Sequence, residues 1–407
     1  MRPLAAIATG ILFLASAAAA AAQAPAFTVT LDPVTNGRIQ LTPPLPPDGN
    51  YPAGTIVTVA ATADAGFAID SIYFSVPGRF GQMYHEHGAS PFAVTIDRDK
   101  RIGASFIDAA AVSHLTVTHD VVVAKPGVKA IKYDVYSPKG ARNMPIIVIV
   151  HGGGWTANDE DIMRGLAREL TRGGRFVVAS LDYRWGGKED GDATGNTMAN
   201  LIEDVFGGIA HVMEHAAQYG GDATRIGVTG DSAGGHLAAA ATLMTDKIGS
   251  RGFGRTAGVF EFAPTYLPRG KTVEQMRGEM LRAIKAGAPS YGVFSAARLN
   301  PYAADPADEA AWKPAIAPLS NIPKATERAV PQFLLRGTRD RLISNAEVTE
   351  FMDALVEAGQ RVEYVQVGGA GHAFFDWKPN AQSKATFARF GVYYAAQMKA
   401  FFEATLY

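Results

Sequence analysis

The stretch that decides the fold is Gly230-Asp231-Ser232-Ala233-Gly234, which matches the pattern G-x-S-x-G. It follows the apolar segment Ile226-Gly227-Val228 and precedes an apolar helical stretch from His236 to Leu243. A serine between glycines at a sharp strand-to-helix turn has a strained backbone and an exposed hydroxyl at the end of the sheet. The helix N-terminus beneath the turn also favours developing negative charge. This context predicts that Ser232 is a nucleophile, and the alternative is a helix N-cap.

A serine on such a turn needs partners that follow in the order acid, then histidine. Only His236 and His372 follow Ser232 in the chain. His236 lies one helical turn beyond the serine, too close to reach back, so we expect it to pack against the sheet or a loop. His372 lies in a glycine-rich loop after the strand predicted at Val362 to Val367, and such a loop can present an imidazole at the sheet edge. We therefore predict that His372 is the base.

The acid must precede His372. Asp340 follows an apolar segment that ends in glycine, Pro331 to Gly337, and so emerges at the end of a strand. Asp305 and Asp308 are alternatives, but both lie in a proline-rich irregular stretch. Asp340 would hold the tautomer of His372 and stabilise its imidazolium.

A glycine-rich turn supplies candidate donors for an oxyanion. His151-Gly152-Gly153-Gly154-Trp155 stands directly after the apolar run from Ile146 to Val150, which is typical of a strand buried on both faces. Glycines allow backbone N–H groups to point into the site, and the N–H of Ala233 beside the nucleophile is a further donor.

The region from about residue 113 to residue 407 alternates between strand and helix. The predicted elements are helices at about 159–172, 198–219 and from 232 onward, with strands at 146–150, 176–181 and 225–229. This alternation predicts an α/β fold with a mostly parallel, doubly wound sheet. An insertion at about 267–329 is expected to act as a cap over the site, with plain packing as the alternative. Trp155 and Trp185 follow strands that end near the site, and we expect them to bind substrate.

The region from Leu115 to Tyr407 resembles the α/β-hydrolases of the esterase and lipase type, close to the hormone-sensitive-lipase-like and bacterial feruloyl-esterase-like branches. The motifs that carry the resemblance are His151-Gly152-Gly153-Gly154-Trp155, Asp182-Tyr183-Arg184, Gly230-Asp231-Ser232-Ala233-Gly234-Gly235, Gly337-Thr338-Arg339-Asp340 and Gly371-His372-Ala373-Phe374. The resemblance implies hydrolysis of carboxylic esters through an acyl-enzyme, without cofactor or metal. The implied substrate is a small-molecule or polysaccharide-linked ester, with feruloyl and acetyl esters as examples. It also implies that Gly153, Gly154 and Ala233 form the oxyanion hole, with Gly152 as a further donor.

Two other functions fit parts of the chain. A serine peptidase of the same fold is one, although such enzymes usually carry a propeller domain that about 80 β-rich residues cannot build. The other is a non-enzymatic surface-binding protein whose N-terminal region is the binding part. The complete set of Ser232, Asp340 and His372 favours an enzyme.

The composition of the 407 residues excludes several classes of protein. Lys and Arg number 38 and Asp and Glu number 39, so the net charge is −1 and nucleic acid is not an expected partner. The absence of cysteine rules out disulfides, thiolate metal sites and a cysteine nucleophile.

The first 112 residues divide into two segments. Residues 1–22 carry Arg2 followed by an apolar, Ala-rich stretch, which predicts a cleaved signal peptide and a periplasmic or secreted protein, with a membrane anchor as the alternative. No integral span is expected after cleavage. Residues 24–112 show short alternating segments separated by turns and predict a small all-β module. Their order weakly resembles bacterial repeat modules, and we consider substrate or surface attachment and passive packing as roles.

Two histidine motifs could suggest metal sites. His85-Glu86-His87 lacks an evident third ligand, so we expect a solvated loop. His211-Val212-Met213-Glu214-His215 matches H-x-x-E-H. On the predicted helix its histidines share a polar face with Asp204, and we expect that face to be solvated.

Overall fold

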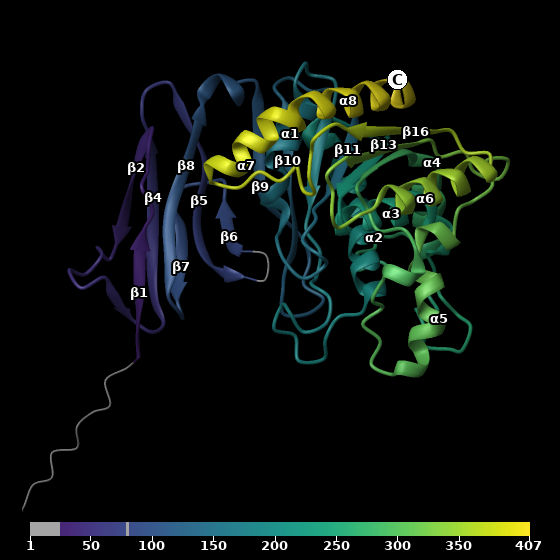
Figure 1. Ribbon diagram of the computed structural model, residues 1–407, viewed down its shortest axis with the longest axis horizontal. Helices are drawn as coiled ribbons and strands as arrows, with labels where there is room; N and C mark the ends of the chain where they lie inside the picture. The colour runs from purple at the N-terminus through teal and green to yellow at the C-terminus, as the bar shows by residue number, and fades with distance from the viewer. Residues whose placement is uncertain (1–24, 79–80) are drawn as a thin grey trace, which may run out of the picture.

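The computed structural model describes residues 25–78 and 81–407. In this part of the chain a β-sandwich lies beside a larger α/β domain (Figure 1). The predicted signal peptide, residues 1–22, lies outside the described residues. Among the helices that are described, none combines the length and the apolar character needed to cross a bilayer.

The N-terminal module consists of two packed β-sheets. Its strands are β1 (Ala26–Leu31), β2 (Gly37–Thr42), β3 (Asn50–Pro52), β4 (Thr55–Ala63), β5 (Phe67–Gly78), β6 (Gly81–His87), β7 (Phe92–Ile96) and β8 (Lys100–Asp108). One sheet has the order β3-β1-β8-β5-β6 and the other has the order β2-β4-β7. Val57, Val94 and Ile102 belong to one buried core, because alternate residues of a strand point to the same face.

The second domain is built around a sheet with the order β16-β15-β14-β13-β11-β12-β10-β9. Its strands are β9 (Leu115–Ala124), β10 (Ile131–Pro138), β11 (Met144–Val150), β12 (Val177–Leu181), β13 (Gly221–Asp231), β14 (Ile284–Ser290), β15 (Gln332–Gly337) and β16 (Val362–Val367). The strands from β11 to β16 pair in parallel, while β10 is antiparallel to both β9 and β12. The predicted fold class, a mostly parallel sheet with helices, is confirmed.

Helices cover both faces of this sheet. They are α1 (Arg164–Thr171), α2 (Met198–His215), α3 (Ala233–Leu243), α4 (Val273–Ala283), α5 (Pro306–Ile316), α6 (Asn345–Glu357), α7 (Ala381–Thr386) and α8 (Val392–Leu406). Figure 1 shows α1 and α8 above the strands, with α2, α3 and α6 below them. Because parallel strands end at one edge, the loops after β11, β13, β15 and β16 meet there.

The predicted insertion at 267–329 is not a single cap, because it contains β14, a central strand of the sheet. The strand escaped prediction because its sequence, Ile-Lys-Ala-Gly-Ala-Pro-Ser, lacks a run of β-branched residues. Small residues are required where α3 and the end of β14 meet, because the two elements pack closely there. A Cβ added to Gly235 would lie only 2.8 Å from the carbonyl oxygen of Ser290.

The two histidine motifs are less exposed than the sequence predicted. His85-Glu86-His87 forms part of β6 rather than a solvated loop, and the Glu86 side chain is buried. On α2, Asp204 and His211 are also buried, so the expectation of a solvated face is wrong. The reason is that partners from other elements satisfy them: Arg184 pairs with Asp204, and the Tyr133 hydroxyl contacts His211 Nδ1 at 3.0 Å.

Candidate active site

The structure brings Ser232, His372 and Asp340 together in one chain of hydrogen bonds. The distance between His372 Nε2 and Ser232 Oγ is 2.8 Å, and that between His372 Nδ1 and Asp340 Oδ2 is also 2.8 Å. The three residues come from the loops after β13, β15 and β16. Asp305, by contrast, caps α5 through the N–H of Ala307. This arrangement can move a proton from the serine hydroxyl to the imidazole.

The backbone of Ser232 has the strain expected of an exposed nucleophile. Its φ of 53° and ψ of −116° place a non-glycine residue at positive φ. Its hydroxyl makes no capping hydrogen bond to α3, so the N-cap alternative is wrong. The turn instead holds the hydroxyl towards His372.

Asp340 is held in its charged form. Burial alone would raise its pKa, but the hydrogen bonds from His372 and from backbone N–H groups outweigh that effect and lower the pKa below its usual value. The N–H groups are those of Leu342, 2.8 Å from Asp340 Oδ1, and Ile343, 3.0 Å from it. A carboxylate held in this way orients His372 and can stabilise its imidazolium.

The glycine-rich turn after β11 lies beside the nucleophile. Gly153 has φ +125° and Gly154 has φ +61°, and a Cβ at Gly153 would collide with the carbonyl oxygen of Ala157 at 2.1 Å. Both glycines line the same cavity as Ser232. Ala233 is the first residue of α3, so its N–H has no acceptor within the helix. Gly152 is not a further donor, because its N–H is donated to Asp231 Oδ1 at 2.7 Å.

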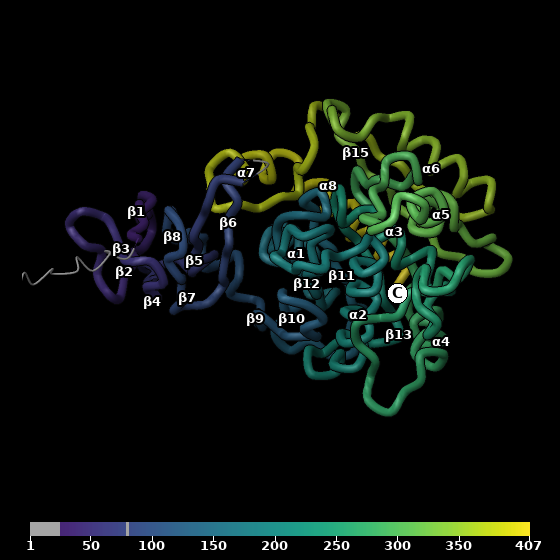
Figure 2. The backbone as a smooth tube through the Cα atoms, turned by 90° about the horizontal axis from the view of Figure 1, so that it is seen from below, coloured from purple at the N-terminus to yellow at the C-terminus, as the bar shows by residue number. Residues whose placement is uncertain are grey.

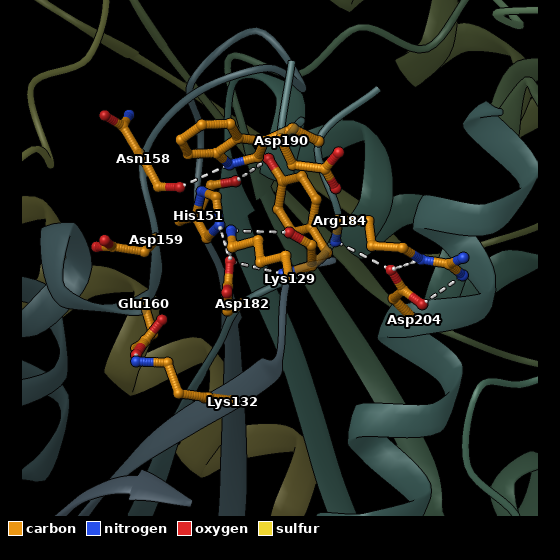
Figure 3. Close-up of polar contacts among 12 residues, drawn as sticks. Lys129, Lys132, His151, Asn158, Asp159, Glu160, Asp182, Arg184, Asp190 and Asp204 are labelled. Atoms are coloured by element: carbon orange, nitrogen blue, oxygen red, sulfur yellow. Dashed lines mark hydrogen bonds and ion pairs between the residues drawn. The ribbon is translucent and has the colours of Figure 1, made fainter. Parts of the chain in front are cut away.

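A buried polar network stands behind this turn (Figure 3). His151 is fully buried, and its Nδ1 lies 2.7 Å from the carbonyl oxygen of Gly152, while its Nε2 lies 3.2 Å from Asp182 Oδ1. Lys129 donates to the same carboxylate oxygen at 2.6 Å. The Tyr183 hydroxyl donates to the carbonyl oxygen of His151 at 2.9 Å. These contacts fix the path of the glycine-rich turn.

Asp231 is a part of the site that the sequence analysis missed. Its side chain is buried next to the nucleophile and accepts the Gly152 N–H. Burial and the neighbouring carboxylate of Asp376 raise its pKa to about 7, against the opposing effect of His372. The motif placed Asp231 beside Ser232, but only the fold shows that it faces Asp376.

A cavity of about 310 Å³ opens in front of Ser232 and His372. Its other lining residues are Gly81, Gln82, Met83, Gly153, Gly154, Ala157, Asn158, Asp231, Leu342, Ala373, Asp376 and Lys378. None of them belongs to the predicted cap at 267–329. The wall opposite the glycine-rich turn therefore comes from other parts of the chain.

The two tryptophans predicted to bind substrate do not line this cavity. The Trp155 indole N–H donates to Nδ1 of the buried His236 at 3.2 Å, so both residues pack in the interior. The Trp185 indole N–H donates to the carbonyl oxygen of Asn158 at 2.8 Å, and Lys129 Nζ lies 4.7 Å from its ring centroid. Each indole N–H is thus bound to a protein acceptor.

Comparisons with known proteins agree with this geometry. The BD-FAE family matches residues 133–259, which carry the glycine-rich turn and the nucleophile. Carboxylesterase NlhH of Mycobacterium tuberculosis is 35% identical over 128 residues, covering 31% of this chain and 38% of that protein. A probable isoprenylcysteine alpha-carbonyl methylesterase, ICMEL1 of Oryza sativa, is 28% identical and covers 59% of this chain and 54% of that protein. The chain thus spans about half or less of the length of these curated relatives.

Solved structures share the fold over a larger part of the chain. A truncated form of a carbohydrate esterase from gut microbiota has a TM-score of 0.53 and 20% identity, covering 72% of this chain and 97% of that one. Thermogutta terrifontis esterase 2 phosphoramylated by tabun has a TM-score of 0.50 and 21% identity, covering 70% of this chain and 96% of that one. The domain that follows the β module therefore has the α/β-hydrolase fold.

Proposed function

We propose that this chain is a serine carboxylesterase that hydrolyses its substrate through an acyl-enzyme. The observation that carries the proposal is the hydrogen-bonded chain from Ser232 through His372 to Asp340, which opens onto a cavity that Gly153 and Gly154 also line. The names of the curated relatives, carboxylesterase and methylesterase, support the same reaction class.

Acylation follows from the positions of these groups. Ser232 Oγ attacks the carbonyl carbon of the ester, and His372 Nε2 takes the hydroxyl proton as the new C–O bond forms. The oxyanion of the tetrahedral intermediate accepts hydrogen bonds from the N–H groups of Gly153, Gly154 and Ala233. His372 then returns the proton to the leaving alcohol as its C–O bond breaks. An acyl group remains on Ser232.

Deacylation repeats these steps with water. His372 takes a proton from the water that attacks the acyl carbonyl, and then protonates Ser232 Oγ as the carboxylic acid leaves. Asp340 stays ionised throughout and stabilises the imidazolium in both halves of the reaction.

The cavity volume favours a small ester or the ester end of a larger molecule. At about 310 Å³ the cavity lies at the lower end of the range for small-molecule sites. Acetyl and feruloyl esters of polysaccharide are substrates to test, because the polysaccharide could remain outside the cavity. We also propose that the protein is exported to the periplasm or secreted, on the basis of residues 1–22.

Labelling with a fluorophosphonate probe, followed by peptide mapping, tests the nucleophile without a known substrate. We expect the label on Ser232 and expect Ser232→Ala to remain unlabelled. A screen of p-nitrophenyl, acetyl-sugar and feruloyl esters against peptides then identifies the reaction. An unlabelled folded protein would overturn the proposal, and cleavage of peptides in preference to esters would replace it with a peptidase.

A further inference from the structure

The cavity in front of Ser232 is lined by residues of both domains. Gly81, Gln82 and Met83, all on β6 of the N-terminal module, lie on its wall together with Gly153 and His372. Figures 1 and 2 both show β6 on the side of the sandwich that faces the hydrolase domain. The module is therefore part of the surface that a substrate meets.

A buried group of side chains holds β6 against the hydrolase domain. This interdomain cluster consists of Asp70, Glu86, Arg164, Arg168 and Trp377. Arg164, on α1, donates to Glu86 on β6 and also to Asp70 Oδ1 at 3.1 Å. The Arg164 side chain is only 2% exposed and that of Glu86 only 3%.

The same cluster reaches the loop that carries the catalytic histidine. The indole N–H of Trp377, five residues after His372, donates to Asp70 Oδ2 at 2.9 Å. Arg168 donates to Asp70 Oδ1 at 2.9 Å, and its guanidinium carbon lies 4.7 Å from the Trp377 ring centroid. The β module and the His372 loop thus share one buried carboxylate as their anchor.

A second contact lies beside the first, at the C-terminal end of β6. His87 Nδ1 lies 2.9 Å from an oxygen of Asp120 on β9, the first strand of the large sheet. Buried and half-buried pairs of this kind fix relative orientation more reliably than they add net stability. Gln82 and Met83 lie towards the opposite end of β6, where they pair in register with Pro77 and Val76 of β5. A wall held by strand pairing can discriminate between substrates, because it does not yield to a group of the wrong size.

We propose that Gln82 and Met83 of the β module are specificity-determining residues, which form one wall of the cleft and select the size of the group on the ester. This inference rests on the proposed esterase function. Met83 is half-buried and offers apolar contact, while Gln82 is exposed and carries an amide at the rim. The module accordingly acts as part of the active site rather than as a spacer.

Variants of the full-length protein test the inference. Gln82→Ala, Met83→Ala and the bulkier Gln82→Trp are compared with matched controls on the module, Gln40→Ala on β2 and Ile56→Ala on β4. Gln40 is exposed and Ile56 is 62% exposed, and neither lines the cavity. Kinetics are measured with p-nitrophenyl acetate, butyrate and octanoate, and with phenyl and 2-naphthyl acetate, so that acyl and alcohol size vary separately.

We expect the smallest substrate, p-nitrophenyl acetate, to be hydrolysed within about twofold of wild type by all variants. For the larger members of the acyl series, the alcohol series or both, Met83→Ala and Gln82→Trp should change kcat/KM by about tenfold. The change should arise mainly through KM, because gaining or losing a few methylene-sized contacts has an effect of this size. The series that responds identifies which part of the ester lies against β6. Circular dichroism and thermal unfolding check that each variant is folded.

Two results would be adverse, and they are distinguishable. If wild type hydrolyses esters but the three cleft variants match Gln40→Ala and Ile56→Ala on every substrate, the role of β6 is overturned while the esterase function stands. If wild type hydrolyses no ester and Ser232 takes no fluorophosphonate label, the proposed function itself fails. Gln82 is exposed, so its variants keep the test decisive even if Met83→Ala does not fold.

Discussion

The catalytic edge of the large sheet and the interdomain cluster are built from similar side chains but differ in what those side chains face. At the edge, Asp340 pairs with His372, whose second nitrogen contacts a strained serine that borders the cavity. In the cluster, Asp70 and Glu86 pair with arginines that are almost fully buried. Asp340 can support chemistry because its partner His372 borders the cavity. Asp70 and Glu86 are enclosed by arginines, and they hold the two domains together instead.

The two regions are also coupled through one short segment. His372 and Trp377 lie on the same loop, so the anchor at Asp70 restrains the chain that carries the base. Damage to the cluster should therefore affect stability first and catalysis second. Damage to the catalytic edge should affect catalysis first.

Replacing the nucleophile should have the largest effect. Ser232→Ala should lower kcat for p-nitrophenyl butyrate by roughly 10⁵-fold, because the general base then has no hydroxyl to activate. The free energy of unfolding should stay unchanged, since the hydroxyl makes no capping bond to α3. Steady-state kinetics and urea unfolding measure the two quantities, with the exposed Ser320→Ala as the control. Turnover that survives in Ser232→Ala would remove Ser232 from the mechanism.

Removing the central arginine of the cluster should be the largest stability change. Arg164→Ala leaves Glu86 buried without its guanidinium partner and leaves Asp70 with Arg168 and Lys384, which should lower the free energy of unfolding by about 3–5 kcal/mol. Arg172→Ala is the control, because its ion pair with Glu169 is on the surface and should contribute less than about 1 kcal/mol. Urea denaturation measures both. Equal losses in the two variants would show that the cluster is not the anchor inferred here.

Trp377→Phe should affect both stability and catalysis, with a smaller loss of unfolding free energy than Arg164→Ala. It removes the indole N–H donated to Asp70, although Ser105 and Lys384 remain as partners of the same carboxylate oxygen. We expect a loss of about 1–2 kcal/mol in unfolding free energy and a few-fold lower kcat/KM. Trp312→Phe, which alters an indole packed against Phe253, serves as the control for loss of ring size. An unchanged kcat/KM in a destabilised Trp377→Phe would separate the cluster from the His372 loop.

Asp231→Asn should change the pH dependence of stability. The pKa of Asp231 is raised to about 7 in the folded protein, above the value of about 3.9 for an unfolded carboxyl group. The folded state therefore binds more protons between these values, and this group's contribution to stability is lost as the pH rises from about 4 to 7. Asparagine keeps an acceptor for the Gly152 N–H but does not titrate.

Urea unfolding at pH 5 and pH 8 measures this difference. From pH 5 to pH 8, the free energy of unfolding should fall more for wild type than for Asp231→Asn. Subtracting one change from the other cancels the contributions of titrating groups that both proteins share. Identical pH slopes would mean that Asp231 does not ionise in this range.

Much of the catalytic edge could be predicted because its signals are local. Ser232 lies between a strand and a helix, and Asp340 and His372 each follow a strand, so the parallel sheet brings all three to one edge. The role of Gly152 and the positions of Trp155 and Trp185 could not be predicted in the same way. Each depends on which distant group takes its N–H: Asp231, His236 and Asn158, respectively.

The sequence by itself determined the fold class and pointed to Ser232, Asp340 and His372, which the structure joins by hydrogen bonds, because the period of apolar residues and the glycines around Ser232 act over a few neighbouring positions. Only the tertiary structure decided that β14 is a central strand, that Glu86 pairs with Arg164, and that β6 forms a wall of the cleft. These features depend on burial and pairing between segments 45 or more residues apart, and no local pattern encodes such pairing.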